Sequence, residues 1–466
     1  MDSIKSDKLL HHCGVVGIFT KEKTNIPEQL FFPLFTLQHR GQESVGIAYE
    51  KEERIVAYKD LGMVSTVLSK YLAEKKESNV GIGHVRYSTQ GASKIENAQP
   101  IVVSCNKGDI ALAHNGNLSN ADSIKRRLFS EGSIFQSTSD TELILHMISR
   151  SSRLNFYSAL REVLQQLEGA FSMTAIHDSA LYIIRDPWGF RPLYFGSKDG
   201  MYMAASETCA FDILRVTDYE EVKPGEIIKI DSSGVYREDY VIPKNKSQCI
   251  FELIYFARPD SEIFGTSVHL CRKKMGALLS KNDVEADFIM PVPDSGNSAA
   301  LGYAAESGLP FEHGLTRSHY SGRSFIMPTE EQRELAVRIK LNPIKEVVRG
   351  KRIVLVDDSL VRGTTSRILV KLLREAGAKE IHLRLSAPEL KWPCYFGIDI
   401  PTREELISNR KTPEEIAEFT KADSVRFLNV EELKQCVTNP EDYCYACFGG
   451  IYPLSVPSSN HTGAKK

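Results

Sequence analysis

The chain has 466 residues, which exceeds the size of one ordinary hydrophobic core and predicts two or three domains. Its 42% hydrophobic and 25% charged residues are typical of a globular protein, and a formal net charge of −2 argues against a nucleic acid or an acidic membrane surface as a partner. No apolar run is long enough to span a bilayer and residues 1–12 lack the apolar core of a signal peptide, so we expect a cytoplasmic protein.

The first half of the chain has the pattern of short strands separated by glycine and asparagine turns. Apolar runs predict strands over Cys13–Phe19, Ser44–Ala48, Val80–Val85, Ile110–Ala113, Phe171–Ile176, Ala180–Ile184, Met201–Ala205 and Ile227–Ile230. The letters HNGN after Ala113 predict a turn. Ser139 is a good N-cap residue, and helices are predicted over Asp140–Ile148 and Asn155–Leu167. Strands grouped around a helical pair indicate a layered α+β fold.

The second half changes to strands that alternate with amphipathic helices, which is typical of a parallel α/β sheet. The polar segment Lys244–Gln248 is the expected connector between the two halves. The pattern predicts strands over Cys249–Phe256, Phe288–Val292 and Ile353–Asp357, and helices over Val268–Leu279, Ser298–Ala305 and Arg367–Ala376.

The most informative stretch is RIVLVDDSLVRGTTS, Arg352–Ser366, where an apolar strand runs into paired carboxylates and a glycine- and hydroxyl-rich loop before a helix. Backbone N–H groups at the start of that helix can bind a phosphate. Asp357 and Asp358 can hold ribose hydroxyls or a divalent metal a short distance away. From the residues alone, an ordinary strand–loop–helix crossover with a polar tip is the alternative.

The same stretch closely resembles the loop that binds phosphoribosyl pyrophosphate (PRPP) in type I phosphoribosyltransferases. The resemblance implies that Asp357 and Asp358 contact the ribose and Mg²⁺. It implies that the 5′-phosphate is bound by the residues Arg362, Gly363, Thr364, Thr365 and Ser366. Upstream, the letters PDSG resemble the pyrophosphate loop of that family, which implies PRPP contacts by Asp294, Ser295 and Gly296 and a Mg²⁺ ligand in Ser295. A turn followed by an N-cap is the alternative for PDSG.

A third segment of the second half, Arg317–Pro343, is basic and contains glycine. It resembles the mobile loop that closes over PRPP in glutamine amidophosphoribosyltransferases. The resemblance implies that Arg323 and Lys340 contact PRPP and that closure of the loop excludes water. Ser318 and His319 differ from the Asn-Arg pair expected there. A solvated surface is the alternative for these basic residues.

Four stretches of the first half follow Cys13 in a recognisable order. They are Arg40–Ser44 (RGQES), Gly83–Gly91 (GHVRYSTQG), His114–Asn117 (HNGN) and Ser139–Glu142 (SDTE). They resemble the glutaminase domain of the N-terminal nucleophile (Ntn) class II amidotransferases, which implies an αββα sandwich. In that family the cysteine becomes residue one, and its α-amine, with an ordinary pKa of about 8, serves as the proton-transfer group. His12 stands where self-processing members have an acidic residue, so autocatalytic removal of residues 1–12, another protease, or retention all stay open.

The resemblance also implies roles for the residues around Cys13, whose thiolate would attack the carboxamide of glutamine. The oxyanion would be stabilised by the Asn115 side chain and the Gly116 backbone N–H. Arg86 would hold the substrate carboxylate, and Asp140 would hold the substrate ammonium group. For Arg86 and Asp140, an ion pair within the protein is the alternative.

The nine cysteines, an odd number, are expected to be free thiols, catalytic groups or metal ligands. Cys444 and Cys447 form a C-x-x-C motif, and the surroundings of Cys249 and Cys394 resemble the iron–sulfur subgroup of the amidophosphoribosyltransferases. This resemblance implies that the four thiolates hold a [4Fe–4S] cluster that clamps the C-terminal segment in place. Structural zinc bound by the same four residues is the main alternative.

The resemblance runs from Cys13 to about Pro453 and identifies the chain as a member of the glutamine PRPP amidotransferase family. It implies four segments: a leader at 1–12, an Ntn glutaminase domain at 13–235, a phosphoribosyltransferase domain with a C-terminal extension at 250–453, and a flexible tail at 454–466. The implied reaction hydrolyses glutamine at Cys13 and channels ammonia to PRPP. The products are 5-phosphoribosylamine, glutamate and pyrophosphate, the first step of de novo purine synthesis.

A homotetramer and inhibition by purine nucleotides are implied by the family alone. Two other functions stay open from the residues: a base phosphoribosyltransferase fused to an inert domain, and a non-catalytic sensor of PRPP or purines. The presence of Cys13, Arg86, Asn115 and Asp140 in one chain argues against both.

Overall fold

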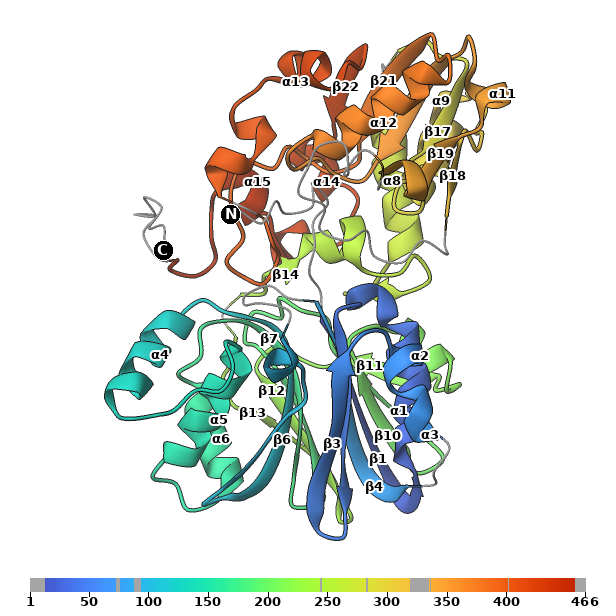
Figure 1. The fold of residues 1–466 in the computed structure, drawn as a ribbon. Helices are drawn as coiled ribbons and strands as arrows, with labels where there is room; N and C mark the ends of the chain where they lie inside the picture. Colours follow the sequence, from blue (N-terminus) through green and yellow to red (C-terminus); the bar gives the residue numbers. More distant parts are fainter. Residues whose placement is uncertain are drawn as a thin grey trace.

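The computed structural model of the chain describes residues 13–72, 76–87, 94–243, 245–281, 284–318, 335, 337–400 and 402–456. These residues form two parts, a lower one of two stacked sheets and an upper one built on a smaller sheet (Figure 1). The expected leader, Arg323 and the end of the expected tail lie outside the described residues. No helix within the described ranges is both long and apolar enough to cross a membrane.

The lower part is a sandwich of two antiparallel sheets. In spatial order, the first contains β11 (Asp218–Glu221), β9 (Tyr194–Lys198), β10 (Met201–Ala205), β1 (Gly14–Asn25), β4 (Glu77–Arg86), β2 (Ser44–Lys51) and β3 (Arg54–Leu61). The second contains β13 (Gly234–Asp239), β12 (Glu226–Asp231), β8 (Ala180–Arg185), β7 (Gly169–His177), β6 (Gly108–Leu118) and β5 (Ile101–Cys105). The strand β13 extends past residue 235, the expected end of the first domain.

The strands of the sandwich contribute to cores on both of their faces, because successive side chains of a strand point to opposite sides of the sheet. Val15 and Phe19 of β1 pack between the sheets, whereas Val16 and Ile18 face the covering helices. The helices over the first sheet are α1 (Ile26–Thr36), α2 (Val64–Val67), α3 (Ser69–Leu72) and α7 (Cys209–Asp212). Those over the second are α4 (Ala121–Ser130), α5 (Asp140–Arg150) and α6 (Phe156–Leu164). The expected αββα sandwich is confirmed.

The turn predicted at HNGN is wrong, because β6 continues through these letters to Leu118. Asn115 lies opposite Ser172 and Gly116 opposite Phe171 of β7, so the chain stays extended beside a neighbouring strand where a turn would have reversed it. The φ of Gly116 is +152°, and a Cβ there would lie 1.9 Å from the carbonyl oxygen of Ala170. The glycine therefore permits a close approach between strands rather than a reversal of the chain.

The upper part is built on a parallel sheet, as the alternating pattern predicted. Its strands, in spatial order, are β17 (Phe288–Pro291), β20 (Arg352–Asp357), β21 (Glu380–Leu385) and β22 (Ser424–Phe427). Val354 and Val356 of β20 pack with α8 (Val268–Leu279) and α9 (Asn297–Ser307). Ile353 and Leu355 face the other side, with α12 (Thr364–Glu375) and α13 (Pro413–Thr420). Helices thus cover both faces of the sheet, as parallel sheets require.

Shorter elements connect these layers. In the lower part they are the helices η1 (Gln38–Arg40) and η2 (Ile95–Asn97). In the upper part they are β15 (Glu262–Ile263), β16 (Thr266–Ser267), β18 (Leu315–Arg317), β19 (Leu341–Pro343), α11 (Lys345–Val348), η4 (Arg403–Glu405), η5 (Ile407–Asn409), α14 (Val430–Lys434), η6 (Pro440–Asp442) and α15 (Ala446–Gly449).

The junction between the two parts is formed by β14 (Gln248–Cys249), which pairs in parallel with β23 (Tyr443–Cys444). The strand predicted over Cys249–Phe256 is wrong, because the chain leaves β14 and forms a π-helix, η3 (Glu252–Phe256). Arg272 donates to the carbonyl oxygens of Leu253 and Ala257, at 2.8 and 2.9 Å, and replaces bonds that a neighbouring strand would have made. An apolar run alone does not distinguish a buried strand from a buried helix.

Candidate functional site

The nucleophile candidate, Cys13, immediately precedes β1 in the first sheet. Its Sγ lies 3.7 Å from the carbonyl oxygen of Tyr87, and its own carbonyl oxygen accepts from Arg40 Nε at 3.0 Å. Burial raises the pKa of the Cys13 thiol, and the nearby charges of Arg86 and Asp140 act on it in opposite directions. The fold therefore brings Cys13, Arg86 and Asp140 into one neighbourhood, although they lie on different elements.

Asp140 holds the start of α5 against the end of β6. Its Oδ2 accepts from the backbone N–H of Leu118 at 3.1 Å, and its Oδ1 lies 3.4 Å from His114 Nδ1. The predicted N-cap is confirmed, since the Ser139 side chain accepts from the Thr141 N–H at 3.3 Å. Burial alone would raise the pKa of Asp140, but His114 and these hydrogen bonds outweigh it and lower that pKa. The carboxylate is thus held in the anionic form that an ammonium group requires.

Asn115 carries a polar group with an unused donor. Its side chain is buried, and within the described part of the chain its Nδ2 has no hydrogen-bond partner. A buried donor left unpaired costs about 1–3 kcal/mol, so such donors are rare in folded proteins and call for an explanation. Asn115 lies on β6 next to Gly116, and two other residues of this strand, His114 and Leu118, contact Asp140.

Arg86, at the end of β4, forms an ion pair that the sequence did not specify. Its Nη1 lies 3.2 Å from Glu43 Oε1, and both side chains are almost completely buried. The ion pair named as the alternative is therefore present. His84 lies on the same strand, and burial together with Arg86 lowers its pKa to about 3, so the imidazole is neutral.

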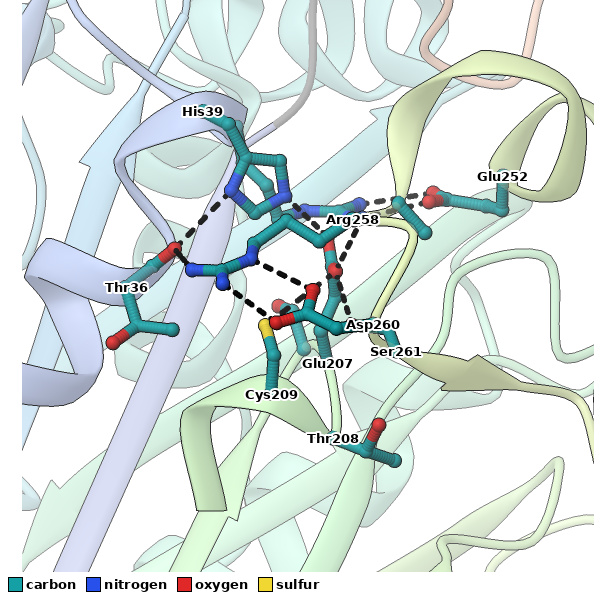
Figure 2. A network of polar contacts seen from close by, with 12 residues as sticks. Thr36, His39, Glu207, Thr208, Cys209, Glu252, Arg258, Asp260 and Ser261 are labelled. Atoms are coloured by element: carbon teal, nitrogen blue, oxygen red, sulfur yellow. Dashed lines mark hydrogen bonds and ion pairs between the residues drawn. The ribbon is translucent and has the colours of Figure 1, made fainter. Parts of the chain in front are cut away.

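A buried polar network joins the first sheet to the junction, and sequence reasoning missed it (Figure 2). Arg40 contacts Glu207 and Glu252, which are 167 and 212 positions away in the sequence. Burial would lower the pKa of Arg40, but these carboxylates outweigh it and raise that pKa. The RGQES letters singled out Arg40, whereas nothing in the sequence indicated its partners.

The second candidate site lies at the carboxyl ends of β17 and β20. Asp357 ends β20 and Asp358 follows it, and both side chains are buried. Ser295 Oγ lies 3.4 Å from Asp357 Oδ1, so the fold joins the PDSG loop to the acidic pair as predicted from their order. Among the described residues Asp358 Oδ2 has no hydrogen-bond partner, and the charge of the buried Arg272 acts on this carboxylate.

The phosphate-loop candidates lead into α12, whose first residues are Thr364, Thr365 and Ser366. Gly363 precedes them with a φ of +79°, and a Cβ there would lie 2.8 Å from Ile407 Cδ1. The helix begins earlier than Arg367, because the loop glycine itself turns the chain into it. The first backbone N–H groups of a helix have no partner within the helix itself, which is the arrangement that an anion requires.

Three other residues predicted to bind PRPP, namely Arg362, Asp294 and Lys340, contact other residues of the protein. Arg362 lies 2.6 Å from Glu405, and Asp294 lies 2.5 Å from Arg317. The Lys340 carbonyl oxygen accepts from the Ser318 N–H at 2.9 Å, next to the β18–β19 hairpin. These surface ion pairs are weak enough to exchange for a phosphate.

Cys249, Cys394, Cys444 and Cys447 line one small hollow between the two parts, together with Phe190, Phe396 and Tyr452. Burial raises the pKa of all four thiols, that of Cys444 to about 12. Four buried thiols in one place are the donor set of a soft metal group, which would stabilise their thiolates. Over the described ranges, no three His, Cys, Asp or Glu side chains are arranged as ligands of a single ion.

Known proteins are similar to this chain over the segments that contain both candidate sites. A family profile described as "Glutamine amidotransferase domain" matches residues 84–212. The chain is 43% identical to an amidophosphoribosyltransferase of Methanocaldococcus jannaschii, over 95% of this chain and 98% of that relative. It is 45% identical to the chloroplastic amidophosphoribosyltransferase 1 of Arabidopsis thaliana, over 96% of this chain and 80% of that relative.

Among solved structures, the chain is similar to a glutamine PRPP amidotransferase from B. subtilis complexed with ADP and GMP. That protein shares 43% sequence identity with a TM-score of 0.89, over 96% of this chain and 98% of the other. The similarity thus extends over both parts of the fold and over both candidate sites.

Proposed function

The chain belongs to the amidophosphoribosyltransferases, the enzymes of the first step of purine biosynthesis, and on this premise we propose which of its residues carry the two half-reactions. The observation that carries the proposal is the presence of two separate constellations in one chain. One surrounds Cys13 in the sandwich, and the other surrounds Asp357 in the parallel sheet. We assign residues 13–235 to the glutaminase half and residues 250–453 to the transferase half.

In the glutaminase half, the Cys13 sulfur attacks the side-chain carboxamide of glutamine, and the leaving amide nitrogen takes a proton and departs as ammonia. The resulting thioester is hydrolysed by water to glutamate, which frees the thiol. The unpaired Asn115 Nδ2 and the Gly116 N–H donate to the oxyanion formed in both steps. Arg86 holds the substrate carboxylate, and the anionic Asp140 holds its ammonium group.

The α-amine of Cys13 transfers the proton, which requires that residues 1–12 be removed. The thiol itself is buried, and its pKa is raised, so a base on the same residue is needed to produce the thiolate. The Tyr87 carbonyl oxygen lies 3.7 Å from the sulfur and accepts from the thiol, which orients the thiol before the attack.

In the transferase half, ammonia attacks C1 of PRPP as the C1–O bond to pyrophosphate breaks. Asp357 and Asp358 hold the ribose hydroxyls and stabilise the positive charge that develops at C1. The first turn of α12, residues 364–366, binds the 5′-phosphate together with Arg362 and Gly363. Asp294 and Gly296 contact the pyrophosphate, and Arg323 and Lys340 close over it.

The residues around Asp357 fit a magnesium ion. Mg²⁺ is commonly held by one or two carboxylates while substrate phosphates and water complete its shell. Here the Asp357 carboxylate lies 3.4 Å from the Ser295 hydroxyl, and the buried Asp358 follows Asp357 in the chain. When bound by Ser295, Asp357 and Asp358, Mg²⁺ would offset the charge of the leaving pyrophosphate. The unpartnered Asp358 Oδ2 supports this assignment.

We also assign a [4Fe–4S] cluster to Cys249, Cys394, Cys444 and Cys447. The four cysteines line one hollow, and a polynuclear cluster needs more room between its ligands than a zinc ion, whose sulfurs lie about 2.3 Å from one point. A polynuclear cluster suits that arrangement better. It would join β14, the segment at Cys394 and the C-terminal segment, and thereby hold the junction together.

Protein purified without oxygen should therefore be brown and contain about four irons per chain. Elemental analysis and the visible absorption spectrum measure this. Cys444→Ser should lower the iron content and destabilise the junction, whereas Cys105→Ser, at a thiol outside the hollow, should change neither. A colourless protein that contains zinc would support the structural-zinc alternative instead.

The proposal includes three further properties: inhibition by nucleotides, an oligomeric state and a location in the cell. The B. subtilis structure is described as complexed with ADP and GMP, which supports inhibition of this enzyme by purine nucleotides. A homotetramer is proposed from the family resemblance. A cytoplasmic location is proposed from the sequence, and the relatives of plants are named as chloroplastic.

The coupled reaction has a distinctive stoichiometry, which tests the proposal. With glutamine, PRPP and Mg²⁺, the protein should form glutamate and pyrophosphate in equal amounts, and ¹⁵N from the glutamine amide should appear in the pentose product. With ammonium in place of glutamine, pyrophosphate should form without glutamate. Consumption of PRPP that depends on a purine base would indicate the base phosphoribosyltransferase, and tight binding of PRPP without turnover would indicate the sensor.

A further inference from the structure

A buried arginine connects the main chain of Cys13 to two carboxylates. Arg40 Nε donates to the Cys13 carbonyl oxygen at 3.0 Å. Arg40 Nη1 lies 2.5 Å from Glu207 Oε1 and 3.0 Å from Glu252 Oε2, and Arg40 Nη2 lies 2.9 Å from Glu252 Oε1. The bidentate contact with Glu252 fixes the plane of the guanidinium, and the guanidinium in turn fixes the Cys13 carbonyl.

The two carboxylates come from different parts of the molecule. Glu207 follows β10 in the sandwich, whereas Glu252 begins η3, after the connector strand β14. Figure 2 shows Glu207 near the centre of the network, close to Ser261 and below His39, while Glu252 reaches it from one side. Both carboxylates are completely buried. A residue outside the sandwich therefore supplies one of the two carboxylates that hold Arg40.

Glu252 is also connected to the other end of the glutaminase site. Its Oε1 accepts from Arg191 Nη1 at 3.2 Å, and Arg191 Nη2 donates to the Phe396 carbonyl oxygen at 2.8 Å. The Phe396 ring stacks on Phe190 of the sandwich, with ring centres 4.4 Å apart. One carboxylate thus holds an arginine that reaches Cys13 and a second arginine that reaches the segment around Phe396.

That segment rests directly on the end of β6. Asn117 Nδ2 donates to the Tyr395 carbonyl oxygen at 2.9 Å. A Cβ on Gly397, whose φ is +94°, would lie 3.2 Å from the carbonyl carbon of Gly116 and 2.9 Å from Arg191 Nη2. The backbone of the upper part is therefore in contact with the backbone assigned to the oxyanion hole, and Arg191 holds it there.

We propose that Glu252 is a positioning residue for glutamine hydrolysis, which through Arg40 orients Cys13 and thereby completes the glutaminase site only when the segment after the connector is docked on the sandwich. The inference rests on the proposed function of Cys13. A nucleophile misplaced by about 1 Å can lose about 10²-fold in rate. Without the Glu252 carboxylate, two buried guanidinium groups would face each other, and their repulsion would displace Arg40 from the Cys13 carbonyl.

The test compares Glu252→Gln, which keeps the shape and removes the charge, with the unchanged enzyme. The probe is 6-diazo-5-oxo-L-norleucine, a glutamine analogue whose diazoketone alkylates a cysteine nucleophile. The rate of labelling at Cys13 and the kcat for glutamine should both fall about 10²-fold, because the sulfur is misplaced. The KM for glutamine should change by about twofold at most, since Arg86 and Asp140 still bind the substrate. Synthesis with ammonium should be unchanged.

Two further variants make the result specific. Glu252→Asp retains the negative charge and should recover most of the labelling rate. Glu221→Gln is the matched control, because it removes a carboxylate that lies 2.6 Å from another buried arginine, Arg185. The contacts of Glu221 with Arg185 and Gln248 do not involve Cys13. In this variant the glutamine analogue should label Cys13 as fast as in the unchanged enzyme.

The possible outcomes separate this inference from the proposed function. If Cys13 of Glu252→Gln is labelled at the unchanged rate, the positioning role is overturned. If this variant loses ammonium-dependent synthesis to the same extent as labelling, the positioning role is also overturned, and Glu252 has a structural role instead. A labelling rate of Glu252→Asp as low as that of Glu252→Gln would also contradict the positioning role. Absence of labelling in the unchanged enzyme would overturn the proposed role of Cys13 together with this inference.

Discussion

Replacing Cys13 with alanine should abolish glutamine-dependent synthesis of phosphoribosylamine, by at least about 10³-fold, while ammonium-dependent synthesis continues. The methyl group cannot form the thioester, so no ammonia is released from glutamine. The proposed PRPP site around Asp357 belongs to the parallel sheet of the upper part, and it can take ammonia directly from solution. Release of pyrophosphate, measured with glutamine and then with ammonium chloride, gives the two activities.

The control for this experiment is Cys105→Ala, at a half-buried thiol on the edge strand β5. It should retain both activities. The mass of the N-terminus should be measured on the same preparations, because only a chain that begins at Cys13 has the α-amine needed for proton transfer. Loss of both activities in Cys13→Ala would contradict two independent sites in one chain.

Replacing Asp357 with asparagine should reduce both glutamine-dependent and ammonium-dependent synthesis by about 10³-fold, the upper range for loss of one electrostatic contact in a transition state. The variant keeps the shape of the side chain but removes the charge that faces C1 and the metal. It also alters the contact at 3.4 Å with Ser295. Labelling of Cys13 by the glutamine analogue should persist, because the sandwich is unaffected.

Asp287→Asn is the matched control, since Asp287 lies at the opposite end of the same pair of strands. Its carboxylate accepts from the Arg352 N–H at 2.7 Å, and it belongs to no proposed site. The control should keep both activities. If Asp357→Asn retained synthesis with ammonium, the acidic pair would not be the PRPP site, whatever the result with glutamine.

The sequence was sufficient to predict those helices, strands and caps that depend on residues close together along the chain. The cap of α5 by Ser139, the helix Val268–Leu279 and the strand that ends in Asp357 were all predicted and are confirmed. The two wrong predictions, the turn at HNGN and the strand after Cys249, fell where partners from distant segments occupy the backbone. Strand β7 extends β6 past the asparagines, and Arg272 holds η3 in its helical form.

The sequence by itself determined which chemical groups are candidates: a cysteine, an arginine, an asparagine and an aspartate for the proposed glutamine site, an acidic pair and a hydroxyl-rich helix start for the proposed PRPP site, and four thiols. It also determined the order of the two halves, because side-chain periodicity is a local property of the chain. The tertiary structure alone decided that Glu252 and Glu207 share Arg40, that Glu43 pairs with Arg86, and that Gly397 rests on Gly116. Such contacts join residues that lie 43 or more positions apart in the sequence, and buried charges find their partners only once packing has excluded water from both.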